Sequence, residues 1–81
     1  MNIHLRLFST YRDIVGVGEM DIELTQGSCL RDLLDVLTSK YPELKSLERK
    51  VLLAVNREFA ALDAVLSQGD EVALMPPIGG G

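Results

Sequence analysis

Residues 28–41 of this 81-residue chain read SCLRDLLDVLTSKY, and apolar side chains recur in them at helical spacing. The stripe follows i, i+3, i+4, i+7 and i+11, which is the pattern of an amphipathic helix with one buried face. Its members are Leu30, Leu33, Leu34, Leu37 and Tyr41. Ser28 is a candidate N-cap, because its hydroxyl can accept an amide of the first turn. Pro42 cannot continue the helix, so we predict one main helix that ends near Tyr41.

Two strands are predicted before this helix. Residues 3–7 alternate between apolar and polar side chains, and residues 19–24 do so again after a connection over residues 9–17. The second segment carries acidic side chains on its polar side, which would pair favourably with His4 and Arg6 across an antiparallel ladder. We therefore expect the two segments to be antiparallel neighbours.

After the helix, residues 42–50 read as a covering loop or one short helical turn. Residues 51–55 are apolar on both parities, which favours a central strand with both faces covered, or a strand whose second face meets a partner. A turn at Asn56-Arg57-Glu58 leads to residues 59–66, predicted as a short edge strand and irregular chain. A second turn over residues 67–70 precedes a last strand at residues 71–75.

One helix and about five strands on this length predict a single α+β domain. The expected architecture is a β-grasp, or ubiquitin-like, fold: a mixed sheet with one main helix packed on one face. A ferredoxin-like fold would need a second full helix, for which no apolar stripe exists. We expect the β-grasp domain to span residues 1–76 and residues 77–81 to form a protruding tail.

Composition excludes several classes of function. Eight Lys and Arg against twelve Asp and Glu give a net charge of −4, without a basic cluster, so we expect no nucleic-acid partner. The longest apolar run has five residues, and the N-terminus lacks a secretory pattern, so we expect no membrane association and a cytoplasmic protein. With one cysteine and one histidine, no common zinc site can form, and we expect no bound metal.

The C-terminal residues 75–81, MPPIGGG, are the unusual feature of the chain. Pro76 and Pro77 stop the last strand, because proline fixes φ and has no N–H for a ladder. The four residues Ile78 to Gly81 could reach about 13 Å when extended, at roughly 3.3 Å per residue. Such a tail could thread a narrow tunnel, although a frayed terminus would look the same.

Fold and tail together resemble the small, sulfur-carrying subunit of molybdopterin synthase, the MoaD family. The resemblance covers essentially the whole chain and rests on Leu53-Ala54-Val55-Asn56, Gly69-Asp70-Glu71-Val72-Ala73 and Pro76-Pro77-Ile78-Gly79-Gly80-Gly81. Arg12-Asp13 after the first strand also fits. The most specific element is the prolyl pair followed by a β-branched residue, one variable residue and Gly-Gly.

The resemblance implies a cycle on the carboxylate of Gly81. An E1-like adenylating enzyme uses ATP and Mg²⁺ to form an acyl-adenylate there, and a persulfide donor converts it to a thiocarboxylate. The tail, from Pro76 and Pro77 through Ile78, Gly79 and Gly80, then enters the large synthase subunit, where the sulfur is donated to the pyranopterin precursor. The chain itself would bind no cofactor and would be non-catalytic alone.

The resemblance also implies a partner interface formed by Phe8, Phe59 and Met75. Phe8 and Met75 fall off the parity of the predicted core, and Phe59 follows a polar turn. Gathered on the face of the sheet that the helix leaves uncovered, they would make an exposed apolar patch beside the tail. Three other functions remain open: a sulfur carrier for thiamin thiazole or tRNA thiolation, a ubiquitin-like protein modifier, and an interaction module with an inert tail.

Overall fold

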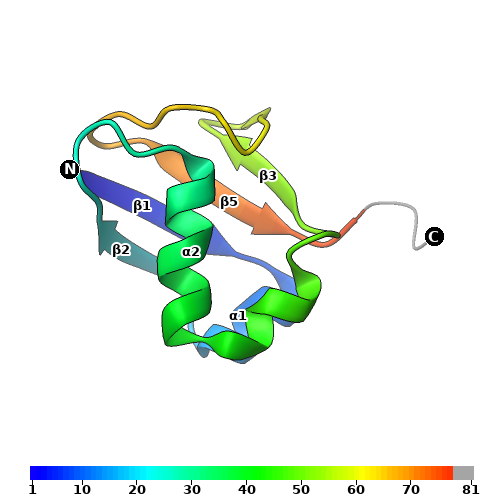
Figure 1. The fold of residues 1–81 in the computed structure, drawn as a ribbon. Coiled ribbons are helices and arrows are strands. Elements are labelled where there is room, and N and C mark those ends of the chain that lie inside the picture. Colours follow the sequence, from blue (N-terminus) through cyan, green and yellow to red (C-terminus); the bar gives the residue numbers. More distant parts are fainter. Residues whose placement is uncertain (78–81) are drawn as a thin grey trace.

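A computed structural model of the protein describes residues 1–77. The chain forms a five-stranded mixed sheet with the strand order β2-β1-β5-β3-β4, and the helix α2 crosses one face of it (Figure 1). The elements in chain order are β1 (Asn2–Leu7), α1 (Ser9–Val15), β2 (Glu19–Glu23), α2 (Leu30–Lys40), the 3₁₀ helix η1 (Pro42–Leu47), β3 (Leu52–Val55), β4 (Glu58–Phe59) and β5 (Glu71–Met75). This is the predicted β-grasp arrangement.

The centre of the sheet is the parallel pair of β1 and β5, and every other pairing is antiparallel. Strands β1 and β2 are neighbours as predicted, with His4 opposite Asp21. Residues 51–55 were predicted as a central strand with both faces covered, or as a strand whose second face meets a partner, and β3 lies inside the sheet between β5 and the two-residue β4. On one face of β3, Leu53 belongs to the buried core, and on the other face Ala54 lines a groove described below.

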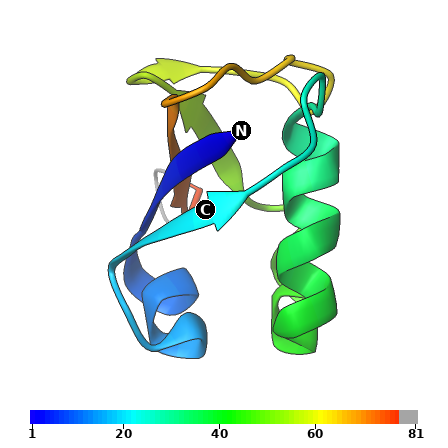
Figure 2. The same cartoon turned by 90° about the vertical axis from the view of Figure 1, so that its left-hand side faces the viewer.

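The core lies between the sheet and α2, which stand as two layers when the molecule is turned by 90° (Figure 2). It is built from alternate residues of the central strands and from the predicted leucine stripe of the helix. Fully or almost fully buried members are Ile3, Leu5, Leu7, Leu30, Leu33, Leu34, Leu37, Val72 and Leu74. Burying one such side chain contributes roughly 1.5–3 kcal/mol, so the helix is held mainly by this stripe.

The start of α2 differs from the prediction by one residue. The N-cap is Cys29, not Ser28, and the backbone N–H of Cys29 donates to Oδ2 of Asp32 at 2.9 Å. Ser28 belongs to the preceding turn, where its N–H donates to the carbonyl of Thr25 and its own carbonyl accepts from Leu66. Those bonds hold Ser28 outside the helix.

Residues 9–17, predicted as a connection, contain the short helix α1. It begins after Phe8 without a side-chain cap and buries only Tyr11. Gly16 ends it in the left-handed conformation, with φ 95°, and its N–H donates to the carbonyl of Arg12 at 2.7 Å. Glycine takes this conformation without the steric cost of a Cβ, which is why the helix stops there.

Candidate partner-binding site

The face of the sheet turned away from α2, here called the open face, carries no helix in the described part of the chain (Figure 2). Side chains alternate along a strand, so the residues between the buried ones point to this face. The register places Ala73 of β5 between Arg6 of β1 and Ala54 of β3. Ala54 in turn lies opposite Phe59 of β4. One row of the open face therefore runs across four strands.

A shallow hollow on this face, here called the open-face groove, lies over β1, β5, β3 and β4. Its lining residues are Arg6, Phe8, Ala54, Arg57, Phe59, Glu71, Ala73 and Met75. Ala54 of β3 lies opposite Ala73 of β5, and their small side chains form the bottom of the groove. Phe8 and Phe59 stand at its sides and are 37% and 69% exposed.

The three predicted interface residues Phe8, Phe59 and Met75 thus line one groove. Large apolar side chains that gather on an exposed surface are typical of protein interfaces. Their contact with a partner stays a prediction, because the structure contains this chain alone. Two charged residues of the same groove, Arg6 and Arg57, were not predicted as part of the interface, whereas Glu71 was expected to steer the activating enzyme.

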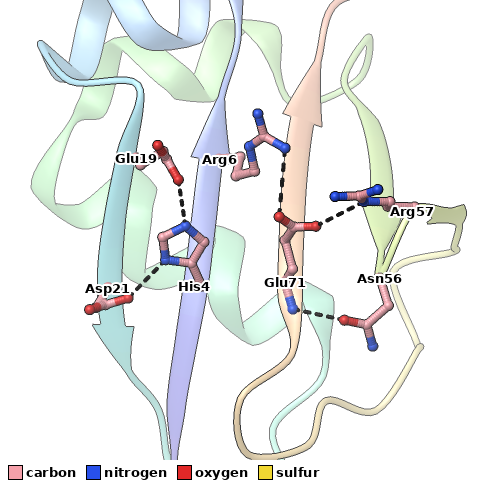
Figure 3. Close-up of polar contacts among 7 residues, drawn as sticks. All are labelled: His4, Arg6, Glu19, Asp21, Asn56, Arg57 and Glu71. Carbon is pink, nitrogen blue, oxygen red and sulfur yellow. Dashed lines mark hydrogen bonds and ion pairs between the residues drawn. The ribbon is translucent and has the colours of Figure 1, made fainter.

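These charged residues form one connected group (Figure 3). Glu71 lies between two guanidinium groups: Oε1 is 3.6 Å from Nη1 of Arg6, and Oε2 is 3.7 Å from Nε of Arg57. The guanidinium of Arg6 also lies 5.4 Å from the ring centre of Phe8, within the range of a cation–π interaction. The signal in the sequence was the position of Arg6 on the outward parity of the first strand.

The hairpin that presents Arg57 is fastened to β5 by Asn56. The side-chain amide of Asn56 donates to Oδ1 of Asp70 at 3.0 Å, and its Oδ1 accepts the N–H of Glu71 at 3.0 Å. The backbone N–H of Asn56 donates to the carbonyl of Glu71 at 2.7 Å. Three hydrogen bonds therefore fix the turn at one end of the groove.

The β2 end of the open face is acidic instead. His4 lies between two carboxylates, with Nε2 2.7 Å from Oε1 of Glu19 and Nδ1 3.0 Å from Oδ1 of Asp21 (Figure 3). The hydrogen bond to Asp21, and then that to Glu19, raises the pKa of His4 above its ordinary value of 6.5. The predicted pairing with the acidic strand is confirmed for His4. Arg6 pairs instead with Glu71, on the other side of β1.

The tail begins at the groove. Met75, a lining residue, ends β5 and is followed by the half-buried Pro76 and the exposed Pro77. The predicted tail residues Ile78, Gly79, Gly80 and Gly81 lie outside the described residues, and the domain boundary after residue 76 stays a prediction. Any protein that takes hold of the tail at Pro77 must therefore approach the rim of the open-face groove.

Comparison with known proteins agrees with this geometry. The model of the ThiS family matches residues 5–81. The chain belongs to the ThiS family. It is 35% identical over 81 residues to the molybdopterin synthase sulfur carrier subunit of Arabidopsis thaliana, covering 100% of this chain and 84% of that protein. The subunit of the same name from Chlamydomonas reinhardtii is 35% identical over 83 residues, with both proteins fully covered.

Among solved structures, the fold of this ThiS-family chain matches small archaeal modifier protein 1 (SAMP1) from Haloferax volcanii. The TM-score is 0.87 at 27% sequence identity, and both chains are fully covered. The β-grasp class predicted for the chain is therefore confirmed.

Other candidate chemistry of this ThiS-family chain is sparse within residues 1–77. No cluster of three or more metal-ligating side chains occurs among them, and none of their helices is long and apolar enough to cross a bilayer. Cys29 is a free, half-buried thiol at the start of α2. The open-face groove is thus the feature of the described chain that best fits a functional surface.

Proposed function

We propose that the chain is the sulfur carrier subunit of a molybdopterin synthase, with the carboxylate of Gly81 as the group that carries sulfur. The observation that carries the proposal is the similarity to named carrier subunits over the full length of the chain. That similarity includes the glycine-rich segment, since the family match runs to residue 81. Both relatives named above are sulfur carrier subunits of molybdopterin synthase, which favours this function over a thiazole or tRNA carrier.

The chemistry follows from the poor reactivity of a carboxylate towards nucleophiles. A carboxylate oxygen of Gly81 attacks the α-phosphorus of ATP, and pyrophosphate leaves. The terminal sulfur of a persulfide donor would then attack the carbonyl carbon of the acyl-adenylate, with AMP as the leaving group, to form an acyl disulfide. A thiol would attack the donor's sulfur in that disulfide, so that the thiocarboxylate leaves and the thiol and the donor end joined in a new disulfide. The activating enzyme would hold the ATP and Mg²⁺, so this chain would need no cofactor of its own and would be non-catalytic alone.

Three partners belong to the proposal: an E1-like adenylating enzyme, a persulfide sulfur donor and the large subunit of molybdopterin synthase. The tail begins beside the open-face groove, so a partner that receives the tail would also cover Phe8, Phe59 and Met75. Pro76 and Pro77 would guide Ile78, Gly79 and Gly80 into that partner. The proposed cycle places the chain in the cytoplasm.

The intact mass of the chain tests this proposal. The purified chain is incubated with ATP, Mg²⁺, a sulfide source and the activating enzyme from the same genome. We expect one oxygen to be replaced by one sulfur, and no change in a chain that lacks Gly81. An unchanged mass, with the enzyme active on another carrier, would contradict the carrier function.

A protein modifier is the second candidate, favoured by the full-length match to small archaeal modifier protein 1. A modifier would form an isopeptide bond between Gly81 and lysine side chains of other proteins. Tagged chain expressed in its own cells would then appear in bands of higher mass, which vanish when Gly81 is deleted. Sulfur loading without such bands would contradict the modifier function and support the carrier function.

A further inference from the structure

The open-face groove carries more positive than negative charge, although the whole chain has a net charge of −4. Two guanidinium groups, of Arg6 and Arg57, share the single carboxylate of Glu71. The groove is therefore a positively charged, partly apolar surface on an acidic protein. A surface of this kind is complementary to a partner that offers an apolar side chain together with a carboxylate.

Arg57 is the cation that a partner can reach. Its side chain is 84% exposed, and its Nε lies 3.7 Å from Glu71, at the long end of an ion pair. Exposed pairs of this length contribute little, about 0–1 kcal/mol, so the guanidinium exchanges partners at small cost. Arg6 is different, because its side chain is 39% exposed and lies against the ring of Phe8.

The backbone of Arg57 is strained. Asn56 and Arg57 form the two-residue turn between β3 and β4, with φ 50° and 70°. Both central positions of such a turn need a positive φ, and the second is strongly favoured by glycine. An arginine at a position that favours glycine costs backbone strain, which points to a functional role for its side chain.

We propose that Arg57 selects the large subunit of molybdopterin synthase by pairing with a carboxylate on its surface. An apolar side chain of the same subunit would rest between Phe8, Phe59 and Met75, over the alanine floor of the open-face groove. This inference rests on the proposed function, which supplies the partner. Arg57 is then a specificity residue for docking, while the sulfur chemistry stays at the tail.

The groove fits a different protein better than a second copy of this chain. A two-fold dimer centred on the groove would bring two positively charged grooves together, and like charges across an interface are unfavourable. The large subunit must receive the tail, and Pro76 leaves the fold next to the groove residue Met75. Continuity with the tail therefore favours the large subunit over a second copy of this chain.

The test measures the Kd of the full chain for the purified large subunit by calorimetric titration. We expect Arg57→Glu to raise the Kd about tenfold. Lys45→Glu is the matched control, because it makes the same charge change at an exposed position of η1, away from the open face. The control should change the Kd less than about twofold.

Two further variants separate docking from folding. Arg57→Gly removes the strain, so it should raise the Tm by about 2–5 °C while it weakens binding. Glu71→Gln removes the carboxylate that competes for Arg57, so it should lower the Kd. If Glu71 instead paired with a cation of the partner, this variant would raise the Kd, and the inference would be wrong.

The outcomes distinguish the inference from the function on which it rests. Sulfur loading of the chain without any binding of the large subunit would overturn the docking inference and retain the carrier chemistry. Binding that is equally tight for Arg57→Glu and the unchanged chain would overturn the role of Arg57 alone. No sulfur loading at all, with normal binding, would contradict the proposed carrier function while Arg57 remained a docking residue.

Discussion

The two faces of the sheet are made by the same strands and yet differ in burial and in the side chains they carry. On the face under α2, Leu74 is 1% exposed and packs among buried leucines. One residue later, Met75 points to the open-face groove and is only half-buried. Because alternate residues of a strand face opposite sides, one parity of β5 can be selected for stability and the other for recognition.

The comparison is tested most strongly by paired alanine substitutions in β5. Leu74→Ala should lower the free energy of unfolding by about 2–5 kcal/mol, because it leaves a cavity in a close-packed core. Met75→Ala removes a partly exposed side chain and should cost less than about 1 kcal/mol. Urea denaturation of both variants measures the difference. Equal losses would mean that the open face also supports the fold.

A charge at Phe59 should have the converse effect. Phe59→Asp leaves the core intact, so the free energy of unfolding should change by less than about 0.5 kcal/mol. Binding of the large subunit should fall at least about 30-fold, because an aromatic anchor at the interface is lost. Val65→Asp is the control, since Val65 is 68% exposed but does not line the groove. An equal rise in Kd for both variants would place the interface elsewhere.

The turn at Asn56 matters for both stability and binding, because it fastens the β3–β4 hairpin to β5 and positions Arg57 at the groove. Asn56→Ala loses two side-chain hydrogen bonds, to Asp70 and Glu71. The expected cost is about 1–3 kcal/mol, since each bond contributes about 0.5–1.5 kcal/mol. Thermal unfolding gives the cost, and amide exchange of β4 reports whether the hairpin opens locally. Unchanged exchange in β4 would show that the strand pairing alone fixes the turn.

The smallest effect is expected at His4, the only histidine. Its pKa is raised, first by Asp21 and then by Glu19, so the protonated ring stabilises the folded state. This contribution is complete below pH 6.5 and is lost as the pH rises through the raised pKa. We therefore expect the Tm to fall in that window, and His4→Gln to lack the fall. The single imidazole resonance gives the pKa directly by NMR, and a value at or below 6.5 would refute the pairing.

Strong periodicity allowed most of the fold to be predicted. In β1 and β5 every second residue is buried, and in α2 the leucines of the stripe are buried, so the apolar periodicity of each segment predicted its buried face. Helix α1 escaped prediction because one buried residue, Tyr11, makes no stripe. Gly16 was the available signal, as a glycine in the left-handed conformation ends the helix.

The site was predicted in part, for a related reason. Phe8 and Met75 stood out because they lie off the parity of the core residues of their strands, Phe59 because it follows a polar turn, and the family resemblance implied their shared role. The group of Arg6, Glu71 and Arg57 comes from three different strands or turns, and it is assembled only by the sheet order. Local patterns identified β2 as a neighbour of β1, but they did not show that β5 lies on the other side of β1. Such groups therefore need the topology before they can be found.

The central parallel pair of strands affects how fast the protein folds. In the ladder between β1 and β5, His4 lies opposite Glu71, at a sequence separation of 67 residues (71 − 4). Contacts this distant in sequence close large loops and slow the search for the native state. Until β5 docks beside β1, neither the groove nor the start of the tail exists. We therefore expect that a newly made chain can bind a partner through the groove only after β1 and β5 have paired. The rate of that pairing would then limit how soon newly made protein becomes functional.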